Sequence, residues 1–165
     1  MTTKSPLLFL ILISTAACGT DGGLGTVLSG QDTLHTLDGI WIQQRSQCNG
    51  SEVTPAPGES TSMSIAGRQA TISNSFDYGG GVVCNVRTPA QVQYESENSV
   101  LFTFQQSACS AGCPEAMCAA LLGYVPPPST FAYVLNEPNL KLTTNDGSTF
   151  GCTKNNPFEV EFARQ

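Results

Sequence analysis

The sequence is short of charged side chains, and this shortage excludes several classes of function. Only 12% of its 165 residues are Asp, Glu, Lys or Arg, which is about half the usual share. The seven basic residues are scattered singly, so no stripe of positive charge is available to neutralise phosphates. With a net charge of −6, the protein is expected to bind neither nucleic acid nor, through charge alone, anionic lipid.

The residues that hydrolytic chemistry requires are also scarce. The single histidine, His35, lies in a polar segment, and no Gly-x-Ser-x-Gly motif supplies a nucleophile. The glycines at 79–81 lack the lysine and the following helix of a phosphate loop. Carboxylate pairs near 95–97 and 159–161 flank turns among polar residues, which favours a solvated face over acid–base catalysis. We therefore expect no enzyme, no cofactor and no metal.

No apolar run is long enough to span a membrane as a helix. The longest, residues 7–13, is far shorter than the ~20 residues that a spanning helix needs. It follows Lys4 and gives way to the small residues 14–17. A charged start, a short apolar stretch and small residues are the three parts of a secretory signal, so residues 1–17 are predicted to be a signal peptide.

Residues 15–18 resemble the end of a bacterial lipoprotein signal, in which the cysteine after the small residues is diacylated and becomes the first residue. Thr15 departs from the leucine usually found there, so ordinary signal-peptidase cleavage is the alternative. The chain has seven cysteines, and lipidation of Cys18 leaves six, an even number that suits disulfides in an oxidising compartment. The resemblance implies anchoring to a bacterial membrane, facing the periplasm or the cell surface. Asp is absent after Cys18, which implies the outer membrane where the cell has two.

Beyond the lipidated N-terminus, residues 18–36 are rich in Gly, Thr, Ser and Asp and are expected to form a flexible tether. Residues 37–165 are expected to form one β domain. Apolar and polar residues alternate most clearly at 99–105 and 131–135. Eight to ten strands with short turns favour an antiparallel up-and-down barrel, because closure removes exposed strand edges. A small disulfide-rich β-sandwich is the alternative.

Three local signals refine this architecture. Pro89 separates the apolar stretches 82–84 and 92–94, which predicts two short strands. Asn145-Asp146-Gly147 predicts a hairpin, with 150–153 as its return strand. Residues 114–122 predict a short helix that begins with a proline and precedes a glycine, and its apolar face is expected to lie against the strands.

The motif Gly39-Ile40-Trp41 at the first strand resembles the Gly-x-Trp signature of lipocalins, and the chain looks like the small lipocalin-like lipoproteins of bacteria. In lipocalins the tryptophan closes the bottom of the barrel and an arginine near the chain's end packs across it. The resemblance implies these roles for Trp41 and Arg164, with Gly39 allowing close packing. Such a guanidinium–indole contact stabilises by roughly 0.5–2 kcal/mol. The alternative is that Trp41 is simply the largest core residue of another β fold.

The six remaining cysteines are expected to form three disulfides: Cys48, Cys84, Cys109, Cys113, Cys118 and Cys152. The 109–118 cluster lacks the paired C-x2-C spacing of zinc sites and has no nearby histidine, which favours disulfides over a metal. Fifteen pairings are possible, and the sequence does not choose among them. One hypothesis attaches the helix to the strands at Cys84 and Cys109 and joins Cys48 to Cys152.

Binding is the class of function that remains. Lipocalin-like barrels hold small apolar molecules, and the interior would be lined by Phe102, Phe104, Phe131 and Tyr133, although in so small a barrel these rings can simply fill the core. The first hypothesis is therefore a tethered, monomeric binder of a small hydrophobic ligand. The second is an interaction protein with a solid core: a hydrolase inhibitor, an envelope scaffold or a cell-surface contact protein. An apolar cavity of several hundred Å³ favours the first, and an exposed apolar patch on the helical insert favours the second.

Overall fold

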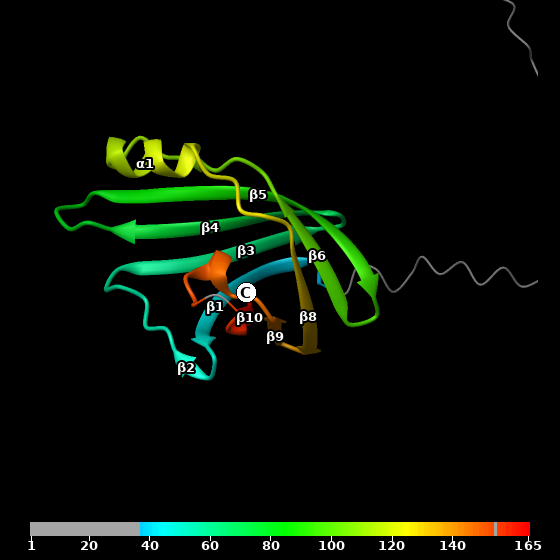
Figure 1. Cartoon of the computed structure of the whole chain (residues 1–165). Coiled ribbons are helices and arrows are strands. Elements are labelled where there is room, and N and C mark those ends of the chain that lie inside the picture. The colour runs from blue at the N-terminus through cyan, green and yellow to red at the C-terminus, as the bar shows by residue number, and fades with distance from the viewer. Residues whose placement is uncertain (1–36, 154) are drawn as a thin grey trace, which may run out of the picture.

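The computed structural model describes residues 37–153 and 155–165. In it, strands whose side chains alternate between inward and outward form a closed barrel (Figure 1). Eight strands form the barrel wall: β1 (Gly39–Cys48), β3 (Glu59–Ala66), β4 (Gln69–Asp77), β5 (Val83–Ser96), β6 (Ser99–Phe104), β8 (Ser129–Asn136), β9 (Asn139–Thr144) and β10 (Phe158–Arg164). The predictions for residues 1–36, including the signal, the lipidated Cys18 and the tether, lie outside the described residues.

Each wall strand pairs antiparallel with the next, and β10 pairs back to β1. This closure confirms the predicted all-β up-and-down barrel and excludes the alternative sandwich of two separate sheets. Two short strands, β2 (Ser51–Glu52) and β7 (Ala108–Cys109), pair with β1 and β5 outside this circuit. In the part of the chain that the structure describes, no helix combines the length and the hydropathy needed to cross a bilayer.

One end of the barrel is closed by a cluster around Trp41, which is completely buried together with Leu37. The indole Nε1 donates a hydrogen bond to the Leu37 carbonyl at 2.8 Å. The guanidinium of Arg164 lies 4.6 Å from the ring centroid of Trp41 and donates to the Asp38 carbonyl at 3.2 Å. Gly39 has a φ of +144°, and a Cβ there would stand only 3.4 Å from Arg164 Nε. The first and last strands are thus joined by side chains as well as by backbone pairing.

The prediction of two short strands around Pro89 was wrong, because β5 runs unbroken past this residue. Pro89 lies opposite Thr71 of β4, and its carbonyl accepts a hydrogen bond from the Gln105 amide at 2.8 Å. In an antiparallel strand the N–H and C=O of one residue point to the same side. The missing N–H therefore faces the gap between β6 and β7, and the ladder with β4 loses no hydrogen bond.

The hairpin predicted at residues 145–147 was also wrong. Strand β9 ends at Thr144, and a loop with one 3₁₀ turn, η1 (Ser148–Phe150), intervenes before β10 begins. Gly147 is buried inside this loop, where a Cβ would come within 2.6 Å of the Phe158 Cβ and 2.8 Å of Cys152 Sγ. Close packing against the Cys48–Cys152 disulfide thus replaces the expected tight turn.

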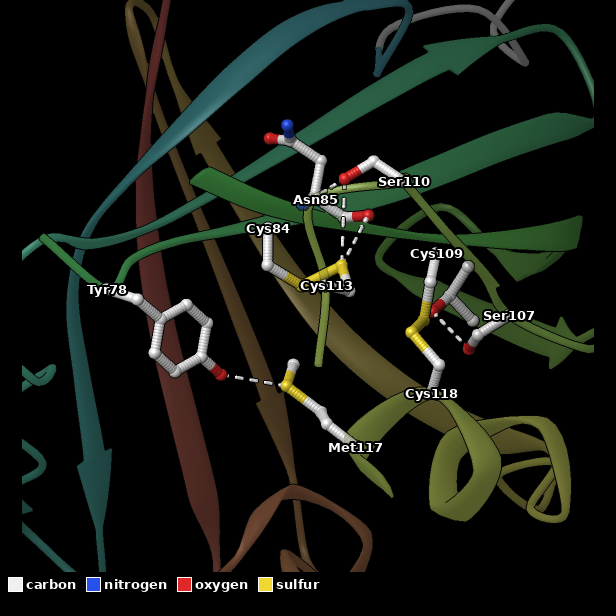
Figure 2. The surroundings of a disulfide bond; sticks show 10 residues. Tyr78, Cys84, Asn85, Ser107, Cys109, Ser110, Cys113, Met117 and Cys118 are labelled. Atoms are coloured by element: carbon white, nitrogen blue, oxygen red, sulfur yellow. Dashed lines mark hydrogen bonds between the residues drawn. A yellow bond between two sulfur atoms is a disulfide. The ribbon is translucent and has the colours of Figure 1, made fainter. Parts of the chain in front are cut away.

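The predicted helix is present as α1 (Glu115–Leu122), and of its apolar face Met117 and Leu121 are partly buried while Leu122 is 46% exposed. None of its side chains is buried, and it lies outside the barrel wall beside β5 (Figure 1). Two disulfides attach this region, Cys84–Cys113 just before the helix and Cys109–Cys118 within it (Figure 2). Covalent bonds therefore add to this limited packing in holding α1 in place.

Two substitutions test the closed end. Trp41→Ala should lower the free energy of unfolding by ~3–5 kcal/mol, as expected for truncation of a large core residue. Arg164→Gln should cost roughly 0.5–2 kcal/mol, because it removes the guanidinium from the indole face. Urea denaturation of both single variants and the double variant gives their coupling energy. Strict additivity would show that the ring and the guanidinium do not interact.

Candidate ligand-binding site

A cavity of about 530 Å³ occupies the end of the barrel opposite Trp41. This volume lies within the roughly 300–1,000 Å³ that is typical of small-molecule sites. Its lining includes Thr54, Pro55 and Ser60, which are exposed residues before and at the start of β3. The cavity therefore opens to solvent at this end, which we call the mouth.

One side of the cavity is an aromatic wall, formed by Phe102, Phe104, Phe131, Phe150, Phe158 and Phe162. The ring centroids of Phe102 and Phe131 are 5.7 Å apart, and those of Phe131 and Phe150 are 5.3 Å apart. Phe150 also stacks on Phe158 at 4.9 Å. These separations are typical of interacting aromatic pairs, so the rings form a continuous apolar surface.

The other side is a polar wall, formed by Gln43, Ser46, Thr61, Asn74 and Thr88, although Phe76 of β4 also lines the cavity there. The Thr61 hydroxyl donates to Asn74 Oδ1 at 2.8 Å across the β3–β4 pair. Gln43 Nε2 donates to the Ser46 hydroxyl at 3.3 Å. The bond from Thr61 uses only the oxygen of the Asn74 amide, so it does not involve the two N–H donors of that amide.

A β-bulge explains why β1 places Ser46 inside the barrel. The register of β1 against β10 shifts between Gln43 and Arg45. Beyond this shift Ser46 is buried, whereas Arg45 is exposed and forms an ion pair with Glu161 at 2.7 Å. An extra residue in one strand re-aims the side chains that follow it. The bulge thus turns a cation outward and a hydroxyl inward.

Charge is nearly absent from the cavity. Among the described residues that line it, Glu59 is the one titratable side chain, and its Oε2 accepts a hydrogen bond from the Ala56 amide at 3.0 Å. The carboxylates of β10 lie outside, where Glu159 pairs with Lys141 at 2.6 Å. Burial raises the pKa of Tyr94 to about 12, but Tyr94 is not part of the lining.

Three of the four predicted lining residues, Phe102, Phe104 and Phe131, do line the cavity. The fourth, Tyr133, does not: it lies two residues further along β8, half-buried against the core beyond the bottom of the cavity. Sequence reasoning did not assign four further phenylalanines to the lining: Phe76, Phe150, Phe158 and Phe162. Phe150 was assigned to a return strand that does not exist, so its position over the cavity had no sequence signal.

The six predicted disulfide cysteines are paired as Cys48–Cys152, Cys84–Cys113 and Cys109–Cys118. This pairing agrees with the hypothesis that joined Cys48 to Cys152 and attached the helical region at Cys84 and Cys109. The sulfur atoms of residues 109, 113 and 118 lie within 4.8 Å of one another. All three are engaged in disulfides (Figure 2), so a metal would require their reduction first.

The Cys48–Cys152 disulfide fixes the loop that carries Phe150, and its removal tests this role. The double variant Cys48→Ser/Cys152→Ser should lose ~2–4 kcal/mol of stability, because the bond joins residues 104 positions apart. The matched control, Cys109→Ser/Cys118→Ser, removes a bond between residues only 9 positions apart and should lose less stability. Thermal unfolding measures both. Two or more titratable thiols in the denatured wild-type domain would contradict the three bridges.

Comparisons with known proteins give no relative from which a role for the cavity can be taken. No family model, curated protein or solved structure matches this chain. The function must therefore be argued from the barrel, its cavity and the chemistry of the lining residues.

Proposed function

We propose that this protein is a membrane-tethered envelope lipoprotein whose lipocalin-like barrel binds a small hydrophobic ligand. The observation that carries the proposal is the cavity of about 530 Å³ with its aromatic wall. A site that presents contiguous rings to an open mouth can bury most of a small apolar molecule. The position of Arg164 over Trp41 supports the resemblance to lipocalins, which hold such molecules in barrels of this kind.

The placement of the chain ends is compatible with a tether. Leu37, the first described residue, and Arg164, near the end of the chain, both lie at the closed end. A tether formed by residues 18–36 would reach roughly 22–26 Å. It would approach the barrel from the end opposite the mouth, so anchoring at Cys18 would leave the cavity accessible.

Binding can be measured with N-phenyl-1-naphthylamine, a neutral apolar dye whose fluorescence rises in apolar surroundings. We expect saturable binding with one dye molecule per barrel. Phe150→Ser should weaken it by a factor of about 10 to 150, because loss of a buried phenyl contact costs about 1.5–3 kcal/mol. Tyr124→Ser is the matched control, since Tyr124 is half-exposed and outside the cavity lining. If Phe150→Ser leaves dye binding unchanged, the dye binds outside the cavity and the proposal is contradicted.

The tether is tested separately. Cys18→Ala, expressed in a bacterium that processes lipoproteins, should move the protein from the membrane fraction to the soluble fraction, because the acyl chains that anchor it are lost. Cys109→Ser/Cys118→Ser serves as a control that removes cysteines without touching the anchor. If Cys18→Ala stays in the membrane fraction, the lipid anchor is contradicted, and only the ligand-binding part of the proposal remains.

A second candidate function, contact with an envelope protein, is favoured by one observation. Large apolar side chains that are 46–53% exposed are present on the helical insert and on the turn between β4 and β5: Tyr78, Val82, Leu122, Tyr124 and Val125. The two segments meet where the Tyr78 hydroxyl donates to Met117 Sδ at 2.9 Å (Figure 2). Exposed apolar patches of this kind often mark interaction sites. A barrel that binds no dye would make this candidate the stronger one.

A further inference from the structure

We infer that the ligand of this cavity is a neutral amphiphile, with hydroxyl or amide groups on an apolar body, and not the anion of a fatty acid. This inference rests on the proposed function and names the class of molecule that the same site accepts. It follows from three features of the lining: the depth at which polar groups stand, the side on which they stand, and the absence of a cation among the described lining residues.

Most of the polar wall stands in the upper half of the cavity, while Thr88 lies deeper, opposite Ile72. On β3 and β4 the facing pair Thr61 and Asn74 lies one layer nearer the mouth than the facing pair Met63 and Ile72. Met63 is buried at 2% exposure. Below the rim, where Glu59 faces Phe76, an entering molecule therefore meets the hydrogen-bonding pair before the apolar pair. The shape and chemistry suit a molecule whose apolar part goes in first.

Most of the polar groups also stand on one side. The polar wall belongs to β1, β3, β4 and β5, although β4 also contributes Phe76 to the lining. The rings of the aromatic wall come from β6, β8, β10 and the loop between β9 and β10, and this loop also contributes Thr149. Gln43 marks the boundary, because it pairs across the barrel seam with Phe162. A ligand held between these walls would place its hydroxyl or amide groups toward Asn74 and Gln43 and its apolar surface toward the rings.

The lining offers nothing to balance a negative charge. Glu59 at the mouth is acidic, and none of the described lining residues is a Lys or an Arg. The cations nearest to β10 point out of the barrel and are already paired, Arg45 with Glu161 and Lys141 with Glu159. An ionised carboxylate buried here would lose its water without gaining a counter-ion, which is strongly unfavourable. A neutral head group has no such cost.

The test compares three ligands that share a twelve-carbon acyl chain: 1-monolaurin, laurate and methyl laurate. Each is used below its micelle concentration, at pH 8, to displace N-phenyl-1-naphthylamine from the full domain. We expect 1-monolaurin to displace the dye at a concentration at least tenfold lower than laurate, and lower than methyl laurate, which lacks hydroxyl donors. Equal or tighter binding of laurate would overturn the inference, while dye binding itself would still support the proposed function.

One variant assigns the preference to the polar wall. Asn74→Leu keeps the approximate volume of the side chain and removes its amide, so the advantage of 1-monolaurin over methyl laurate should shrink at least fivefold. Thr103→Val, an outward and exposed position on β6, is the control and should leave the ranking unchanged. Dye affinity measured on every variant shows whether the cavity has survived. A variant that binds dye normally and still prefers 1-monolaurin by the wild-type margin would refute the role of Asn74.

Discussion

The pairing of β1 with β10 is the constraint on which the rest of the structure depends. It turns an eight-stranded meander into a closed wall, so that no long edge is left to pair with another chain. The seam is held at both ends by side chains far apart in sequence. Arg164 lies over Trp41 at one end, and the Cys48–Cys152 disulfide joins β1 to the loop before β10 at the other. Without the seam neither the closed end nor the cavity would exist.

The same seam explains why the two ends of the barrel differ. At the closed end, β1 follows strict alternation and directs Trp41 into the core. Beyond the bulge near Gln43, β1 buries the short polar side chain of Ser46, which faces Val160. A serine leaves space that the opposing rings do not fill. The register change of β1 therefore contributes to the cavity.

Much of the architecture could be predicted from the sequence because it depends on local alternation. Phe102 and Phe131 face inward as that pattern predicts, and the barrel closes as the run of short strands suggested. What could not be predicted depends on pairing between distant segments. Whether Pro89 interrupts a strand depends on which side its missing N–H faces. Whether Tyr133 lines a cavity depends on how deep the cavity is, although it shares a strand face with Phe131.

Phe150 shows that the candidate site, too, depends on contacts between distant segments that the sequence pattern does not reveal. Its ring contacts Phe104, Phe131 and Phe158, yet it lies in no strand, so no periodic pattern could assign it to the interior. Its position follows from the buried Gly147 and from the disulfide that holds the loop. The loop thus completes the aromatic wall that the strands begin. The selectivity that we propose therefore depends on both parts of the chain: the strands supply the polar wall, and a covalently fixed loop completes the apolar one.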